Sequence, residues 1–263
     1  MTAAERRAVR VAFAIAARRT LADPGGLVVS GAFYLIVVSA LAAVWRVAAD
    51  ANGGTLVGYS AAALTWYIAT SESVTISLNI RMIGDLGEDI GSGVVAVELL
   101  RPASVLWIRV ASELGRAAAR LLVIGPAGVG LATLTVGQPP SWPALVLAVP
   151  AAALALTANV IAQHAFAASA FWLRNATTAW FLYQKLVFVL GGMLIPLEVF
   201  PGWLEAVARA LPFQAMAYAP ARIAAGHVEP LLLAGQMAWI AGLALAARAV
   251  FRMGERRLQV VGG

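Results

Sequence analysis

Residues 121–173 decide the fold: LLVIGPAGVGLATLTVGQPPSWPALVLAVPAAALALTANVIAQHAFAASAFWL contains no charged residue. A helix that crosses the hydrocarbon core of a bilayer needs about 20 mostly apolar residues, so this stretch is too long for one crossing. Residues 137–143 (GQPPSWP) interrupt the apolar run with one glycine and three prolines. The stretch therefore predicts two membrane-spanning helices joined by a short turn.

The rest of the 263-residue chain shares this apolar character. Hydrophobic residues make up 61% of it, charged residues only 12%, and the mean hydropathy is +0.83. Soluble domains are about one quarter charged, so the composition argues against a soluble enzyme, a disordered tail and a nucleic-acid-binding module. The chain has no cysteine and only two histidines, which excludes disulfides, thiolate metal sites and histidine-rich metal centres.

Other charge-poor stretches extend the prediction to six spans in a single transmembrane domain, residues 1–263. We expect the spans at residues 27–45, 56–79, 117–136, 144–172, 176–197 and 230–250. With both termini inside, all but three of the 19 basic residues fall on inner segments, the exceptions being Arg46, Arg209 and Arg222. Because inner loops are rich in Lys and Arg, this bias predicts cytoplasmic termini. The pI near 10.5 then reflects topology rather than nucleic-acid binding.

Residues 1–23 have the pattern of a helix that lies in the membrane interface. Apolar residues recur at helical spacing on one side and arginines on the other: Val9, Ala12, Phe13 and Ala16 against Arg7, Arg10 and Arg18. The arginines would then face anionic headgroups. The alternative interpretation is a basic tail that only sets the topology.

The inner segment at residues 82–103 carries an acidic cluster of Asp85, Glu88 and Asp89, set among glycines. Its apolar residues Ile83, Leu86 and Ile90 share one face of a short helix. This pattern predicts a cytoplasmic docking helix, with an apolar edge that enters a partner's pocket and charges that orient it. A solvated loop is the alternative.

Arginines at helical spacing follow this segment and lead into the third span. We expect a helix that enters the inner leaflet and continues as span three, with Glu113 paired to Arg109 and Arg116.

The outer segment at residues 198–226 is too apolar for a solvated loop and too broken to span. Pro196 ends the fifth span, Pro201 starts a short helix, Pro212 breaks it, and Gly226 ends a second one. We expect a pair of short helices that dip into the outer leaflet, packed against protein.

Two ionisable residues lie within predicted spans and are candidates for the transport pathway. Glu72 in span two and Lys185 in span five would pair or face a shared path, together with the aromatic residues Trp66, Phe181 and Phe188. The alternatives are a lysine that reaches the inner interface, a glutamate near the end of its span, and aromatic side chains that only pack. No motif of a nucleotide-binding or hydrolytic site occurs in the sequence.

Two segments resemble signatures of bacterial ABC transporter type-2 (ABC-2 family) export permeases. The first reads EDIGSG at residues 88–93, followed by ELLRP at 98–102. The second reads GGMLIPLEVFP at residues 191–201, followed by LPF at 211–213 and YAP at 218–220. The order of these segments and the six-span frame agree with the family along essentially the whole chain.

The resemblance implies a transport subunit of the bacterial plasma membrane, not an enzyme. It implies two cytoplasmic ABC ATPase subunits as partners, and a second permease copy or a paralogous sister permease. ATP and Mg²⁺ would bind to the ATPase, and this chain would hold no cofactor or metal. The exported substrate would be hydrophobic or amphipathic, such as a drug, a lipid or a lipid-linked product. A secondary transporter or channel and a membrane-embedded lipid-modifying enzyme are the alternatives.

The resemblance also assigns residues to roles. The ATPase-coupling segment would comprise Asp85, Gly87, Glu88, Asp89, Ile90, Gly93, Arg101 and Pro102. An outer re-entrant gate would be formed around Pro196, Pro201, Pro212 and Phe213.

Overall fold

The computed structural model describes residues 2–100, 104–173 and 176–261, with side chains described up to residue 257. The described chain is almost entirely helical. Its long helices are α1 (Ala3–Leu21), α2 (Pro24–Ala51), α3 (Ala61–Ser77), α6 (Val105–Val136), α7 (Trp142–Ala167), α8 (Thr177–Leu190) and α11 (Pro230–Val261). The described strands, β1 (Thr55–Leu56) and β2 (Tyr59–Ser60), pair as one antiparallel hairpin.

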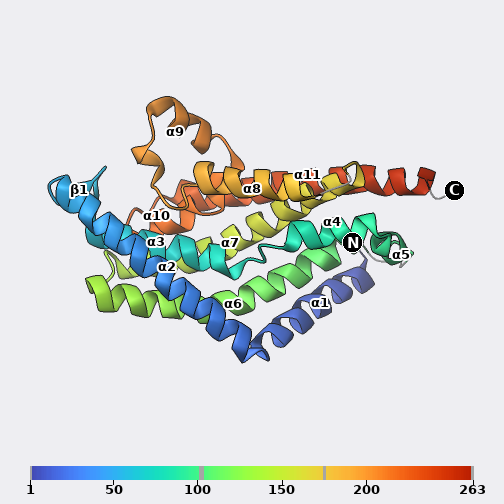
Figure 1. Ribbon diagram of the computed structural model, residues 1–263, viewed down its shortest axis with the longest axis horizontal. Helices are drawn as coiled ribbons and strands as arrows, with labels where there is room; N and C mark the ends of the chain where they lie inside the picture. Colours follow the sequence, from blue (N-terminus) through green and yellow to red (C-terminus); the bar gives the residue numbers. More distant parts are fainter. Residues whose placement is uncertain (1, 101–103, 174–175, 262–263) are drawn as a thin grey trace.

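Short helices cluster at the two ends of this bundle. At one end lie α4 (Met82–Gly91) and α5 (Val94–Glu98), beside the start of α1 and the end of α11 (Figure 1). At the other end lie the β1–β2 hairpin, α9 (Gly202–Arg209) and α10 (Tyr218–Ala224). We call these the termini end and the hairpin end.

Among the described residues, four helical segments are long and apolar enough to cross a membrane: Pro24–Ala51, Val105–Val136, Trp142–Phe171 and Pro230–Arg257. The third of these includes the 3-10 turn η1 (Ala168–Phe171), which extends α7. The two other predicted spans correspond to α3 and α8, which have 17 and 14 residues. Both are shorter than the roughly 20 residues of a full crossing helix.

Glycines explain why these two helices are shorter than predicted. Gly53 and Gly54 have positive φ in the turn between α2 and β1, and Gly58 has positive φ in the turn between the two strands, so α3 begins at Ala61 rather than near residue 56. The hydroxyl of Ser60 caps the new start by accepting from Ala63 N at 3.2 Å. At the end of α8, Gly192 has φ +62, which stops the helix at Leu190 rather than at residue 197.

The third span, by contrast, begins earlier than residue 117. The amphipathic stretch expected before it is part of the same helix, so α6 runs without a break from Val105 to Val136. Likewise α11 continues past residue 250 to Val261.

Helix α3 lies at the centre of the molecule, packed against α2, α6 and α10. Its side chains are buried on nearly all sides, including Leu64, Tyr67 and Ile68. Its hydroxyl groups are satisfied locally: Ser73 Oγ donates to Ala69 O at 2.6 Å, as buried polar groups require. This helix is therefore a protein-enclosed element, unlike α2, whose apolar residues are largely exposed.

Candidate functional site

The acidic helix α4 packs its apolar face into its own chain. Ile83, Leu86 and Ile90 are 1%, 2% and 4% exposed and belong to the core formed with α7 and α8. The expectation that this apolar edge, Ile90 included, enters a partner's pocket is therefore wrong. Gly87 makes the packing tight, because a Cβ there would lie 2.3 Å from the Cβ of Ala176.

The three acidic residues of α4 divide into two kinds. Asp85 and Glu88 are exposed at the termini end. Asp89 instead faces α6, where its Oδ2 accepts a hydrogen bond from Arg109 Nη1 at 2.7 Å. Only Asp85 and Glu88 therefore remain free to meet another protein.

Arg109 also holds the following helix, α5. Its Nε donates to Glu98 Oε2 at 2.8 Å, so one guanidinium group joins α4, α5 and α6. The expected Glu113–Arg109 pair does not form, because Arg109 is engaged by these two carboxylates; Glu113 pairs with Arg116 alone. Gly93 separates α4 from α5 with φ +82. Arg101 and Pro102 lie outside the described residues.

The pathway candidates fall into two separate groups. Trp66 and Glu72 are buried in α3, whereas Phe181, Lys185 and Phe188 are exposed along one face of α8. Lys185 Nζ lies 5.2 Å from the ring centroid of Phe181. Within the described ranges no ion pair joins Glu72 to Lys185, so the structure does not bring these two charges together.

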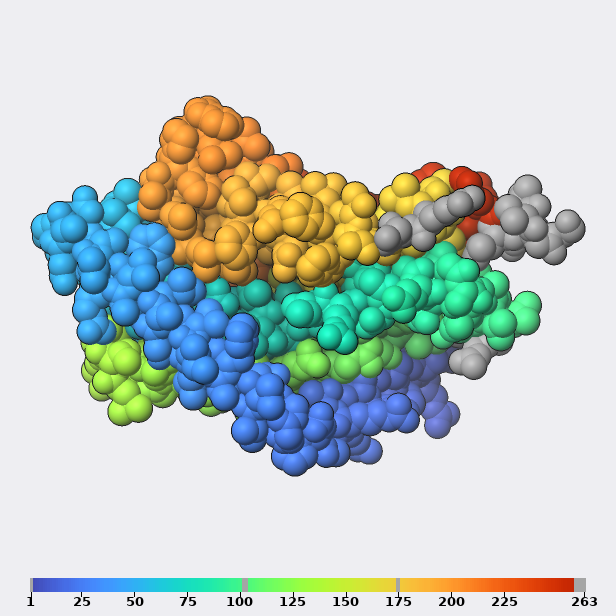
Figure 2. Space-filling model, in the orientation of Figure 1, coloured from blue at the N-terminus to red at the C-terminus, as the bar shows by residue number. Residues whose placement is uncertain are grey.

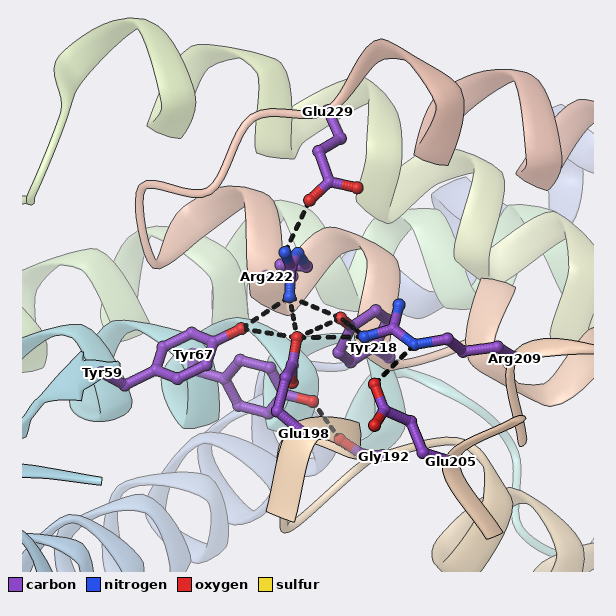
Figure 3. Close-up of polar contacts among 9 residues, drawn as sticks. All are labelled: Tyr59, Tyr67, Gly192, Glu198, Glu205, Arg209, Tyr218, Arg222 and Glu229. Carbon is purple, nitrogen blue, oxygen red and sulfur yellow. Dashed lines mark hydrogen bonds and ion pairs between the residues drawn. The ribbon is translucent and has the colours of Figure 1, made fainter. Parts of the chain in front are cut away.

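At the hairpin end, polar side chains from four elements meet in a compact group (Figure 3). We call it the outer cluster: Tyr59, Glu198, Arg209, Tyr218 and Arg222. Glu198 lies in the 3-10 turn η2 (Leu197–Val199), and the other members come from β2, α9 and α10.

The Glu198 carboxylate is the centre of the outer cluster. Its Oε1 accepts from the Tyr218 hydroxyl at 2.6 Å and from Arg209 Nη2 at 3.3 Å, and it forms an ion pair with Arg222. The Tyr59 hydroxyl lies 3.4 Å from the same oxygen. Burial raises the pKa of both tyrosines, so each phenol keeps its proton at neutral pH and can donate it.

Further contacts tie this cluster to its surroundings. Arg222 Nη1 donates to the hydroxyls of Tyr218 at 2.7 Å and Tyr59 at 3.2 Å. Arg209 Nε donates to Glu205 Oε1 at 2.8 Å, and Arg222 pairs with Glu229. The outer cluster therefore joins the hairpin, η2, α9 and α10 into one unit.

The chain between α8 and η2 is anchored to α3 as well. The Tyr67 hydroxyl donates to Gly192 O, and Ser71 Oγ donates to Met193 O at 2.8 Å. Tyr218 N in turn donates to Gly191 O at 2.9 Å. This segment is irregular, but three consecutive carbonyls, those of Gly191, Gly192 and Met193, are bonded to buried partners, as an irregular chain at membrane depth requires.

The expected pair of re-entrant helices proves to be unequal. Helix α9 protrudes from the molecule, with Trp203 and Val207 exposed (Figure 2). Helix α10 is buried against α3 and α7, with Tyr218 and Ile223 in the core.

The proposed gate residues mark the boundaries of these elements. Pro196 precedes η2, Pro201 precedes α9, and Pro212 opens the 3-10 turn η3 (Pro212–Ala215). Phe213 is buried in the main core.

The outer cluster was not predicted from the sequence. A signal was present, because Glu198, Arg209 and Arg222 are charges within a segment too apolar for a solvated loop. Charges in such a segment must be paired when it is buried.

Comparison with known proteins now identifies the family. Residues 35–262, most of the chain, match the family described as ABC-2 family transporter protein. A search of curated proteins gives no significant match. Members of this family are transport components rather than catalysts, they partner with an ABC ATPase in a transporter complex, and the apolar helices agree with a multi-pass membrane protein. The match confirms the resemblance seen in the sequence: this chain belongs to the ABC-2 family of transporter proteins.

Proposed function

We propose that this chain is the permease subunit of an ABC exporter in the bacterial plasma membrane. It forms the translocation pathway and is driven by two separate cytoplasmic ATPase subunits, which bind ATP and Mg²⁺. A second permease, identical or a paralogous sister, completes the pathway. The substrate is hydrophobic or amphipathic, in keeping with the apolar and aromatic exposed face of α8.

The path of the chain supports six crossings despite the two short helices. Helix α3 runs from the hairpin end to the termini end, where α4 follows it in the chain. Helix α8 begins beside α4 and runs back towards η3 at the hairpin end. Each helix thus makes a pass in the direction that a span would require. The irregular chain that follows α8 bonds its carbonyls at Gly191, Gly192 and Met193 to α3 and α10, so it can cover the remaining distance without exposing those groups to lipid.

One observation carries the coupling assignment: α4 presents its acidic residues and buries its apolar ones. Asp85 and Glu88 are exposed at the end of the molecule where both termini lie. The arginine distribution supports a cytoplasmic position for this end, on the side of an ATPase. The apolar face and Arg109 hold the helix to the permease, so that a push on its acidic face moves α6 and α8 with it.

The test is co-expression with the partner ATPase and measurement of complex formation. The double variant Asp85→Asn/Glu88→Gln should capture at least about fivefold less ATPase, because charge pairs at a binding surface contribute about 1 kcal/mol or more. Asp50→Asn removes an exposed carboxylate at the end of α2, on the opposite side, and should capture as much ATPase as the unmodified chain. Equal capture by all three chains would show that α4 is not the docking element.

A further inference from the structure

Helices α1 and α2 form an angle with each other beside α6 (Figure 1). Residues of these three helices line a cavity. Its volume is about 640 Å³, and it is lined by the second half of α1, the turn into α2, the first turns of α2, and one face of α6. Nothing in the export mechanism uses this space. We propose that the cavity binds the headgroup of an anionic phospholipid from the leaflet at the termini end.

One wall of the cavity is rich in guanidinium groups. Arg19 of α1 and Arg116 and Arg120 of α6 line it together. Arg116 directs Nε and Nη2 to Glu113, and Arg120 directs Nη1 to Leu78 O at 3.3 Å, which leaves each of them with free N–H donors. The Arg19 side chain makes no hydrogen bond or ion pair within the described part of the chain. Guanidinium groups with free donors are the side chains best suited to phosphate oxygens.

The charge balance favours a phosphodiester. Two carboxylates lie beside the three arginines: Glu113, paired to Arg116, and Asp23, which caps α2 by accepting from Gly26 N at 3.1 Å. One positive charge therefore remains in excess. A single phosphodiester, as in phosphatidylglycerol, would neutralise it.

Much of the remaining lining is apolar, which points to a lipid rather than a soluble anion. It includes Ala12 and Ile15 of α1 and Leu27 and Val29 of α2. Val29 is largely exposed and begins the long apolar surface of α2, along which acyl chains can lie. The arginines are thus placed at headgroup depth, just where the chain enters the membrane. Basic pockets between transmembrane helices at the inner face are typical phospholipid sites.

Close helix packing holds the two walls in place. A Cβ at Gly115 of α6 would lie 2.3 Å from Phe13 O, so α1 and α6 touch backbone to backbone beside the cavity. The headgroup would therefore enter a preformed site and connect α1, α2 and α6.

The test is lipid binding to the purified full-length chain, measured by native mass spectrometry. We expect the chain to retain phosphatidylglycerol and not phosphatidylcholine. The double variant Arg19→Gln/Arg120→Gln should bind phosphatidylglycerol at least about tenfold more weakly, because each arginine supplies charge-assisted hydrogen bonds. Arg18→Gln is the matched control: it removes an exposed arginine of the same helix that does not line the cavity.

Equal retention of phosphatidylglycerol and phosphatidylcholine would overturn the proposal. So would unchanged phosphatidylglycerol binding in the double variant, or an equal decrease in that binding in the double variant and in Arg18→Gln. Displacement of the lipid by an equimolar amount of inorganic phosphate would also overturn it, because it would identify a soluble anion as the ligand. Arg19→Glu, at an exposed position, provides a second variant if the double variant does not fold; unchanged binding there would contradict the proposal. The measurement needs no ATPase, so its outcome is independent of the proposed export function.

Discussion

Glu198 shows how a charge is kept within an apolar segment of this protein. Two phenols and two guanidinium groups surround its carboxylate, and the side chain is mostly buried. Removing the carboxylate takes away the charge that Arg209 and Arg222 share and leaves them with Glu205 and Glu229 alone among the described residues. Breaking such a mostly buried group costs more than losing an exposed ion pair. The residue therefore matters more for the stability of the hairpin end than its position in an irregular turn suggests.

Glu198→Gln should lower the free energy of unfolding by about 3 kcal/mol, because Arg209 and Arg222 lose their shared carboxylate. A lower midpoint of thermal unfolding in detergent is the measurement. Glu205→Gln, which removes only the i,i+4 pair with Arg209, should cost about 0.5 kcal/mol and serves as the control. Equal midpoints for the two variants would show that Glu198 does not organise the outer cluster.

The sequence predicted that the acidic residues of α4 lie on a short helix, but not that they divide between solvent and Arg109. Periodicity placed Ile83, Leu86 and Ile90 on one face, and that grouping agrees with the structure. It could not assign a partner to that face, because an apolar stripe looks the same whether it is covered by the same chain or by another. The turn of Asp89 towards Arg109 depends on residues 20 positions apart, which no local pattern contains.

At the scale of elements, Arg109 of α6 links α4 and α5 to its own helix. Its two carboxylate partners lie on separate short helices that Gly93 would otherwise allow to turn independently. Neither helix is long enough to be stable alone, since isolated helices below about 12 residues are marginal in water. Their order therefore depends on burial of the apolar face and on this one guanidinium group.

Arg109→Gln should loosen α4 and α5 without changing the long helices. Hydrogen–deuterium exchange should rise by about fivefold or more in residues 85–99, because a partly buried charged hydrogen bond contributes about 1.5–3 kcal/mol. Arg81→Gln, at an exposed position just before α4, is the control and should leave exchange unchanged. Unchanged exchange in Arg109→Gln would mean that apolar packing alone orders the segment.

Element boundaries were the less predictable part of the fold. Hydropathy located each apolar run, but α3 and α8 are shorter than their runs because glycines with positive φ end or delay the helices. The mean hydropathy of a stretch of sequence also does not distinguish a helix that faces lipid from one that faces protein. Helices α2 and α3 are both apolar, yet α2 is largely exposed and α3 is enclosed.

At the scale of the whole molecule, the two ends of the bundle hold different elements. The start of α1, the end of α11 and the acidic helix α4 share one end, and the outer cluster occupies the other. Because the start of α1 and the end of α11 lie at the same end, the chain makes an even number of passes. Together with the arginine bias, it supports the proposal that the exposed acidic pair meets a cytoplasmic motor.

Because the chain has no cysteine, single cysteines can report directly on this arrangement. The most direct test is crosslinking of Glu88→Cys to the co-expressed ATPase with a short bifunctional reagent in intact membranes, compared with Asp50→Cys at the hairpin end. The account predicts a permease–ATPase crosslink from position 88 and none from position 50. A crosslink from position 50, or none from position 88 while the complex remains intact, would contradict it.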